Sequence, residues 1–290
     1  MKVAISIPAL NEEKDLGGVI EEINSVMSKT DYDYKVYVLD DGSTDNTVEV
    51  AKKAGAIVNS NGRNLGLAET FKHELRVCLG DGADVIVHTD ADGQYMASDI
   101  VRLLKKLEEG YDLVIGSRFY HKIEHMPFMK RLGNKAFAKV FSKLLKVKLT
   151  DTTTGFRAFT REVAEKVEYI NTFTYTQEQL IRASKLRFRI AEIPIKTRST
   201  RESRLFKSAF GYAIRAWINI LRIYRDFAPL RFFGSIGALF LFLGVAIGLW
   251  LVTVFIRTGD VTHIPSAILS MLLITTGMQV ILFGFFADKK

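Results

Sequence analysis

Apolar and polar residues alternate along residues 1–120 in short blocks that predict strands and helices in turn. We expect strands at 3–8, 35–39, 56–59, 85–89 and 113–117, and helices at 16–28, 44–54, 66–79 and 100–109. Ser43 or Thr44 would cap the second helix, because both residue types favour that position. Short strands that alternate with helices are typical of an α/β fold with a mainly parallel sheet and helices on both faces. In such sheets, ligands bind beyond the carboxyl ends of the strands, where the strand order reverses.

The end of the chain has a different pattern, because two long stretches carry no charged residue. Residues 232–256 and 264–287 lack Asp, Glu, Lys and Arg, and each exceeds the roughly 20 residues that cross a bilayer. Glycines recur at helical spacing in the first stretch, which favours close helix packing in lipid. We therefore predict two transmembrane helices rather than two buried helices of a soluble core.

Composition and charge limit the class of protein without selecting it. The chain has 290 residues, 48% of them hydrophobic, and a net charge of +8. A basic protein attracts nucleic acid, anionic membranes or phosphorylated substrates. The single cysteine, Cys78, excludes an internal disulfide and fits a reducing compartment, and its apolar surroundings indicate a core residue. Strand-like residues follow Lys2 at once, so we expect no signal peptide.

Residues 85–94, VIVHTDADGQ, carry the most specific chemical signal. Residues i and i+2 of a strand point to the same side, so Asp90 and Asp92 are expected to converge. Mg²⁺ takes one or two carboxylates and leaves its other positions to water and substrate phosphates, although Asp-x-Asp also occurs in solvated turns. Asp40 and Asp41 also follow a predicted strand, so the two acidic clusters are expected in one crevice. No dinucleotide fingerprint and no P-loop is present, which disfavours a dehydrogenase and a P-loop NTPase.

Six motifs carry a family resemblance that covers about residues 1–210. PALNEE at 8–13, DDGSTD at 40–45 and DADGQ at 90–94 resemble the inverting family-2 glycosyltransferases of the GT-A fold. GSR at 116–118, DTTTGFR at 151–157 and EIPI at 192–195 resemble the dolichyl- and polyprenyl-phosphate sugar synthases of that family. The resemblance implies transfer of one hexose from a nucleotide-sugar to a lipid phosphate, with inversion to a β-linked product.

The resemblance also implies the site. Asp90, Asp92 and Gln94 would hold Mg²⁺ or Mn²⁺ against the donor diphosphate and neutralise charge on the leaving group. Arg118 would touch a donor or acceptor phosphate and, with Asp92 and Gln94, make up the catalytic group; the alternative is a surface arginine. The implied nucleotide-sugar-binding residues are Pro8, Leu10, Glu12, Val38, Asp40, Asp90, Ala91, Asp92, Arg118, Arg198 and Arg204.

Some of these residues have a second interpretation or depart from the family pattern. Glu12 and Glu13 could instead compensate the dipole of the helix that starts at residue 16. Residues 198–205 resemble an R-x-x-G-x-S-K-L loop, with arginine in place of the glycine and Arg204 in place of the lysine. Arginine binds phosphate bidentately, so the second change preserves the role, whereas loss of the glycine alters the backbone. Leu10 stands where mannosyl members commonly carry tyrosine.

Two basic segments bear on the acceptor. Residues 128–148 have no acidic residue, and helical spacing separates a lysine face from an apolar face. Such a helix lies on anionic lipid, or else packs on the core as a solvated helix. Residues 206–231 repeat the pattern as a juxtamembrane amphipathic helix. Because a bilayer anchor follows, we expect no nucleic-acid role. Lys130, Arg131 and Asn134 match the place where the resembling enzymes meet the lipid phosphate.

The expected mechanism is a single in-line displacement at the anomeric carbon. A phosphate monoester has a second pKa of about 6 and is already mostly dianionic at neutral pH, so the acceptor needs no general base. Glu178 lies where hydroxyl-transferring relatives carry their base, and we expect it to orient or to support the fold. The alternatives are a glycosyltransferase acting on a lipid hydroxyl or polysaccharide and, in another class, a non-catalytic membrane-anchored nucleotide-sugar-binding subunit.

The predicted organisation is a GT-A catalytic domain at 1–205, the juxtamembrane helix at 206–231 and two transmembrane helices at 232–287. Basic residues precede the first span and follow the second, whereas residues 257–263 between them are nearly neutral. The positive-inside rule then predicts an integral membrane protein with its catalytic domain and both termini in the cytoplasm. The sequence leaves open the donor (GDP-mannose, UDP-glucose or UDP-N-acetylglucosamine), the prenyl chain, the choice between Mg²⁺ and Mn²⁺, and a homo-oligomer.

Overall fold

The chain forms two compact units, Met1–Ala209 and Phe210–Lys290. The computed structural model describes residues 1–119, 138–139, 141–142, 145, 147–169, 175–198, 218, 221–222, 224–260 and 263–288.

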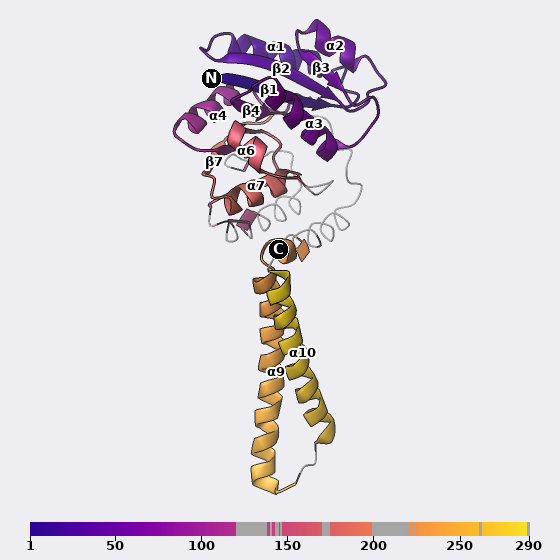
Figure 1. Ribbon diagram of the computed structural model, residues 1–290, viewed down its shortest axis with the longest axis vertical. Coiled ribbons are helices and arrows are strands. Elements are labelled where there is room, and N and C mark those ends of the chain that lie inside the picture. Colours follow the sequence, from indigo (N-terminus) through magenta and orange to yellow (C-terminus); the bar gives the residue numbers. More distant parts are fainter. Residues whose placement is uncertain are drawn as a thin grey trace. The chain divides into compact units, whose positions relative to one another are not determined.

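The first unit is an α/β domain built on one seven-stranded sheet (Figure 1). Its strands are β1 (Lys2–Ala9), β2 (Asp33–Asp40), β3 (Ile57–Ser60), β4 (Val85–His88), β5 (Leu113–Ser117), β6 (Arg157–Thr160) and β7 (Ile190–Pro194). Its described helices are α1 (Leu16–Met27), α2 (Thr47–Lys53), α3 (Leu67–Gly80), α4 (Ser98–Glu108), α6 (Arg161–Lys166) and α7 (Tyr175–Lys185). The strand order is β3-β2-β1-β4-β6-β5-β7, and β6 runs antiparallel to β4 and β5. The predicted α/β fold with a mainly parallel sheet is confirmed, and the strand order reverses between β1 and β4.

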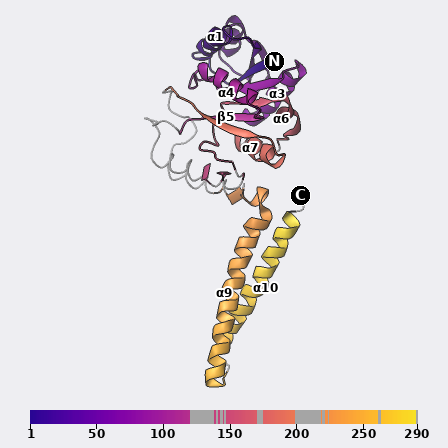
Figure 2. The same cartoon turned by 90° about the vertical axis from the view of Figure 1, so that its left-hand side faces the viewer.

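The sheet is buried on both faces, which explains why its central strands read as continuous apolar runs. Every residue of β4 and β5 is buried. Val3, Ile5 and Ile7 of β1 share a core cluster with buried residues of α1 and α4. Helices α3 and α6 contact each other and the strands from the opposite face (Figure 2). Cys78 is buried in α3, as the sequence predicts.

The second helix starts later than the sequence predicts. The predicted start is Thr44, whereas α2 begins at Thr47, because the preceding residues are used in a loop. Asn11 N donates to Ser43 Oγ at 3.0 Å, and Thr44 N donates to Asn11 Oδ1 at 2.8 Å. These contacts hold the segment in a non-helical conformation. The other predicted boundaries in residues 1–119 agree with the structure to within two residues.

Strand β4 ends before Asp90 and Asp92, which the sequence predicts to converge because they would share one side of an extended strand. Thr89 N still donates to Ser6 O at 3.0 Å, but the strand itself ends at His88. Asp90 and Asp92 lie in the turn that follows, where Gly93 has a φ of +70°. The strand alternation used to place the two carboxylates together is therefore wrong. The turn places them instead.

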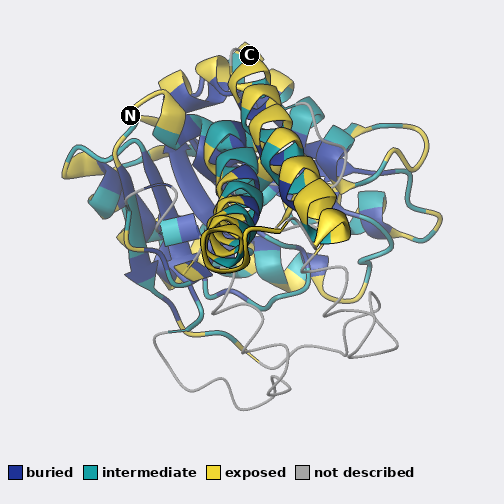
Figure 3. Cartoon of the chain, turned by 90° about the horizontal axis from the view of Figure 1, so that it is seen from below, coloured by how far each residue is buried: buried dark blue, intermediate teal, exposed yellow. Residues whose placement is uncertain are grey.

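The second unit contains two long helices, α9 (Pro229–Thr258) and α10 (Ile264–Ala287). Both are long and apolar enough to span a membrane, and they cover the two predicted spans. Large apolar side chains point away from the pair; Phe242, Ile256 and Phe286 are each more than 70% exposed. In Figure 3 most of the sheet is coloured as buried, whereas both long helices are mostly exposed.

The two long helices meet through small residues that recur every seventh position on each side. These are Gly237 and Gly244 of α9 and Ser270, Gly277 and Gly284 of α10, all of them buried. A Cβ atom on Gly237 would lie 2.6 Å from Gly277 O. Ser270 Oγ donates to Gly244 O at 2.7 Å. The backbones are thus close enough that a larger side chain would force them apart.

Candidate functional site

The loops that follow β1 and β2 are tied together at one edge of the sheet. Glu12 N donates to Thr47 Oγ1 at 2.8 Å, and Asn46 N donates to Glu13 Oε2 at 3.1 Å. The Glu13 carboxylate therefore lies at the amino end of α2. Pro8 pairs with Leu39 across the parallel strands. The nucleotide-binding residues predicted here lie on neighbouring strands or their loops: Pro8, Leu10, Glu12, Val38 and Asp40.

Asp40 is buried at the end of β2 and is held by its own chain. Its Oδ1 accepts from Ser43 N at 3.0 Å, and its Oδ2 accepts from Ser60 Oγ at 2.6 Å. Burial alone would raise the pKa of Asp40, but hydrogen bonds from Ser43, Ser60 and Gly42 outweigh it and lower the pKa. The Asp40 carboxylate is therefore ionised at neutral pH.

Asp41 has a role that the sequence did not indicate. Its carboxylate accepts from Leu65 N and Gly66 N, each at 2.9 Å, and from Asn61 Nδ2 at 3.0 Å. Gly42 makes this approach possible: its φ is +81°, and a Cβ would lie 2.5 Å from the Arg63 carbonyl carbon. Asp41 thus ties the 61–66 loop to the end of β2. The one sequence feature that could have indicated this role is the glycine, Gly42, that follows the two aspartates.

The acidic loop after β4 lies beside the strand-order reversal. Gln94 N donates to Asp92 Oδ1 at 3.0 Å. Gly155 lies against Asp90, since a Cβ there would stand 2.9 Å from Asp90 Oδ1. Burial raises the pKa of Asp90, and the charge of Asp92 adds to the rise, whereas His88 lowers it. Asp90 and Asp92 are therefore close enough to repel each other.

The donor set of this loop suits a cation that is shared with a substrate. Among the residues that the structure describes, no group of three His, Cys, Asp or Glu side chains could enclose a metal ion. Two carboxylates and an amide oxygen would leave positions for water and phosphate, as Mg²⁺ requires. A cation would also relieve the repulsion between Asp90 and Asp92. The residues fit a divalent ion that arrives with a diphosphate.

Arg118 is bound by the 151–157 motif. Its Nε donates to Asp151 Oδ2 at 2.7 Å, and its Nη2 donates to Asp151 Oδ1 at 3.1 Å and to Thr153 Oγ1 at 2.8 Å. Burial alone would raise the pKa of Asp151, but Arg118 outweighs it and holds the pKa low. Arg118 also lowers the pKa of Asp90 through its charge. The arginine therefore lies near the acidic loop, fixed by Asp151.

Glu192 of β7 holds the start of the same motif through hydrogen bonds to its backbone. It accepts from Thr150 N at 2.8 Å and from Asp151 N at 2.8 Å. Burial raises the pKa of Glu192 despite these hydrogen bonds. The glutamate of the EIPI motif thus supports the loop that holds Arg118.

Arg198 is near the acidic loop through its backbone but not through its side chain. Arg198 N donates to Gln94 O at 3.0 Å. Its guanidinium makes two bonds to Glu22 of α1, at 2.6 and 3.0 Å. Glu22 also accepts from Ala97 N at 3.1 Å. The predicted contact of Arg198 with a donor phosphate therefore requires the side chain to leave Glu22.

Glu178 and the 128–148 segment bear on the acceptor. Glu178 is buried in α7, and its Oε1 accepts from Arg182 Nε at 3.0 Å. Phe141 and Leu145 are buried, and Ser184 Oγ of α7 donates to Leu145 O at 3.3 Å. These two apolar side chains thus pack on protein rather than on lipid. The other predicted acceptor or loop residues, Lys130, Arg131, Asn134 and Arg204, lie outside the described residues, as does most of 206–231.

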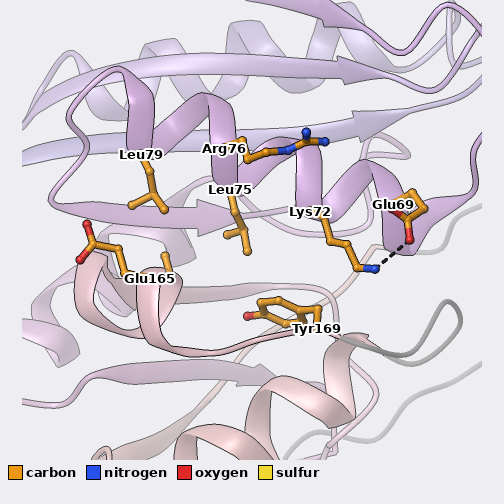
Figure 4. Close-up of a pocket in the computed structure, with 8 residues that line it drawn as sticks. Glu69, Lys72, Leu75, Arg76, Leu79, Glu165 and Tyr169 are labelled. Atoms are coloured by element: carbon orange, nitrogen blue, oxygen red, sulfur yellow. Dashed lines mark hydrogen bonds and ion pairs between the residues drawn. The ribbon is translucent and has the colours of Figure 1, made fainter.

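A surface groove lies between α3 and the segment that contains α6 (Figure 4). Lys72 and Arg76 of α3 line it together with Tyr169, and Lys72 pairs with Glu69 at 2.8 Å. None of the predicted site residues that the structure describes lines this groove. The groove is therefore not part of the predicted site.

Comparison with solved structures identifies the fold class. Glucosyl-3-phosphoglycerate synthase from Mycobacterium tuberculosis, solved with Mn²⁺, UDP-glucose and phosphoglyceric acid, matches with a TM-score of 0.60 at 22% identity. The match covers 76% of this chain and 79% of that one. The α/β unit therefore has the GT-A type of fold.

Comparison of sequences identifies the family. The model of glycosyl transferase family 2 matches residues 4–168, and the chain belongs to this family of glycosyltransferases. The dolichyl-phosphate hexose transferase of Haloferax volcanii is 35% identical over 214 residues, 73% of this chain and 90% of its own length. A UDP-N-acetylglucosamine–dolichyl-phosphate N-acetylglucosaminyltransferase of Methanococcus voltae is 30% identical over 218 residues, 67% of this chain and 85% of its own length.

Proposed function

We propose that the protein transfers one hexose from a nucleotide-sugar to dolichyl or polyprenyl phosphate, with inversion at the anomeric carbon. The observation that carries the proposal is the acidic loop of Asp90 and Asp92, at the strand-order reversal and near Arg118, in a chain that also has two helices able to span a membrane. The names of the archaeal relatives support the lipid-phosphate acceptor.

The donor would be held from two sides of the strand-order reversal. Pro8, Leu10, Glu12, Val38 and Asp40 would surround the base and ribose, where a carboxylate accepts from hydroxyl or N–H groups. Asp90, Asp92 and Gln94 would hold Mg²⁺ or Mn²⁺, which supplies charge neutralisation for the leaving diphosphate. The structural neighbour with bound Mn²⁺ supports this use of a divalent ion. Ala91, Arg118, Arg198 and Arg204 would complete the donor site.

The acceptor would be positioned rather than activated. A phosphate monoester is mostly dianionic at neutral pH, since its second pKa is about 6. Lys130, Arg131 and Asn134 would screen this charge and aim one oxygen at the anomeric carbon. Glu178, buried and bonded to Arg182, suits a supporting role better than that of a general base. Transfer to a phosphate oxygen then requires no base beside the acidic loop.

Membrane attachment would keep the active site beside its lipid substrate. Arg222, Arg225 and Arg231 precede or open α9, whereas the loop between the helices is nearly neutral. By the positive-inside rule, the catalytic unit and both termini would lie in the cytoplasm, where nucleotide-sugars are made.

The decisive experiment mixes membranes that contain the full-length chain with polyprenyl phosphate and labelled GDP-mannose, UDP-glucose or UDP-N-acetylglucosamine. We expect organic-extractable label from one donor, lost in EDTA and restored by Mg²⁺ or Mn²⁺. Asp92→Asn should abolish transfer, whereas Asp33→Asn, at the exposed start of β2, should not.

Each alternative function has its own outcome in this assay. Label that appears in a polymer or in a neutral glycolipid would show that the acceptor is a polysaccharide or a lipid hydroxyl rather than a lipid phosphate. No label from any donor, with nucleotide binding intact, would indicate a binding subunit. Full transfer in EDTA would remove the metal assignment.

A further inference from the structure

A buried polar chain that the proposed reaction does not use lies beneath the acidic loop. His88 Nδ1 is 2.8 Å from Glu74 Oε2 of α3, and His88 Nε2 is 3.0 Å from Tyr175 Oη of α7. Because a carboxylate accepts, Nδ1 donates to Glu74, and Nε2 shares the second hydrogen bond with the Tyr175 hydroxyl. Glu74 and His88 are fully buried and Tyr175 is 4% exposed. These three residues are called the Glu–His–Tyr chain.

The Glu–His–Tyr chain is buried from solvent and packs on an aromatic ring, so bulk water does not compete for its hydrogen bonds. The Phe71 ring stacks on Tyr175 at 4.4 Å and meets His88 edge-on at 5.2 Å. Polar groups in such a place restrict the fold to one arrangement when all are satisfied, and are costly when one is lost. The chain joins α3, β4 and α7 in a single geometry.

Arg157 of β6 extends this arrangement on the same face of the sheet. It pairs with His88 across the antiparallel strands and is fully buried. Its guanidinium donates to Thr176 O and Gln179 Oε1, each at 2.9 Å, and to Thr154 O. Within the described residues, these acceptors are all neutral oxygens. Its charge lies 5.9 Å from the Tyr175 ring, which is bonded through His88 to the carboxylate of Glu74.

The Glu–His–Tyr chain and Arg157 each hold a backbone segment next to Asp90. His88 precedes Asp90 by two residues, so fixing the imidazole fixes the end of β4. Arg157 holds the carbonyl of Thr154, and the next residue, Gly155, lies so near that a Cβ would be 2.9 Å from Asp90 Oδ1. The Asp90 carboxylate thus stands between two backbone segments that the buried network holds.

We infer that the Glu–His–Tyr chain and Arg157 position the Asp90 carboxylate for a cation-bound diphosphate. These side chains are buried behind Asp90 and would not touch the ligand, so they are positioning residues. The inference rests on the proposed function, because it assigns a purpose to the geometry of a proposed metal ligand. Outer groups that orient metal ligands are typically worth about 10–100-fold in metal affinity.

The test measures how strongly Mn²⁺ enhances binding of UDP or GDP to the full-length chain in detergent, by calorimetry with and without EDTA. Tyr175→Phe removes the hydroxyl but keeps the ring on Phe71. We expect this variant to lose about 10-fold of the Mn²⁺ enhancement while nucleotide binding in EDTA is unchanged. The matched control is Tyr37→Phe, which removes a hydrogen bond to Asp81 elsewhere in the α/β unit. It should lower the unfolding temperature without changing the enhancement.

A second pair of variants separates orientation from packing. Glu74→Gln keeps an acceptor for His88 Nδ1 and should retain more of the Mn²⁺ enhancement than Glu74→Leu. Equal losses in these two variants, or full enhancement in Tyr175→Phe, would overturn the inference. A lack of any Mn²⁺ enhancement in the unaltered chain would instead overturn the proposed function on which the inference rests.

Discussion

The α/β unit and the pair of long helices use their residues in opposite ways. In the α/β unit, buried polar side chains join loops to strands, as Asp41 does with Leu65 and Gly66. In the helix pair, contact occurs where side chains are missing, as between Gly237 and Gly277. The structure of the α/β unit depends on polar side chains that bridge its loops. The contact between the long helices depends on small residues that let their backbones approach.

This difference is the one expected between a unit in water and a helix pair in lipid. Backbone N–H groups of a loop must find partners once they are buried, and carboxylates at strand ends accept from them. Lipid supplies no hydrophobic force between helices, so their association depends on close backbone packing. Substitutions in the two units should therefore fail for different reasons.

The largest effect is expected for Asp151→Asn, which leaves Arg118 without its buried partner. Removing one member of a buried ion pair costs about 3–5 kcal/mol. Because Arg118 holds the pKa of Asp151 low, the pair stabilises the fold fully above about pH 4. That contribution is lost as the pH falls through the lowered pKa, so the variant should have a shallower acid transition.

Hydrogen exchange of β4, β5 and β6 peptides in the full-length chain measures this loss. The control is Arg161→Ala, which breaks an exposed pair with Glu165 and should change stability by at most about 0.5 kcal/mol. If both variants lost the same stability, burial of the ion pair would not explain the effect of Asp151→Asn.

The second effect tests whether close packing in the α/β unit also requires a glycine without a Cβ atom. Gly42→Ala should cost about 3 kcal/mol, from backbone strain at a φ of +81° and from contact with the Arg63 backbone. Gly62→Ala has a similar φ of +70° but open space, so it should cost only about 1–2 kcal/mol. Denaturant unfolding of both variants provides the comparison, and equal costs would leave strain as the sole cause.

The third effect concerns the helix pair. A Cβ at Gly244 would lie 2.8 Å from Ile274 Cγ1, whereas at Gly234 it would meet nothing within 4 Å. Gly244→Ala should therefore cost about 1–2 kcal/mol, and Gly234→Ala should cost nothing. Trp250 lies 5.1 Å from the His263 ring, so its fluorescence during SDS titration reports separation of the pair. A Trp217→Phe background leaves Trp250 as the only tryptophan. A Gly234→Ala variant as unstable as Gly244→Ala would argue against close packing.

The smallest effect comes from the polar bond between the long helices. Ser270→Ala removes the donor to Gly244 O and should cost about 0.6 kcal/mol. Thr275→Val removes a hydroxyl that donates within its own helix, to Met271 O, and should be nearly neutral in the same titration. The reverse ranking would mean that the bond between the helices contributes no stability.

The site was partly predictable because the carboxyl ends of parallel strands share one edge. Residues 8–13, 40–45 and 90–94 therefore fall on that edge once the strands are placed. The pairing of Arg198 with Glu22 was not predictable, since 176 residues separate them. The strand argument for Asp90 and Asp92 also failed, because β4 stops at His88 and a turn sets their positions.

The sequence by itself determined the α/β class, the acidic loop, the two apolar helices and the elements of residues 1–120 apart from the start of α2, because periodicity and turn residues act over a few neighbours. Only the tertiary structure decided that Glu74, His88 and Tyr175 meet, since 14 and 87 residues separate His88 from its partners. It likewise decided that Arg157 lies opposite His88 and that Gly155 lies against Asp90. Such contacts depend on strand order and register, which are set by packing of the whole unit and leave no local pattern in the chain.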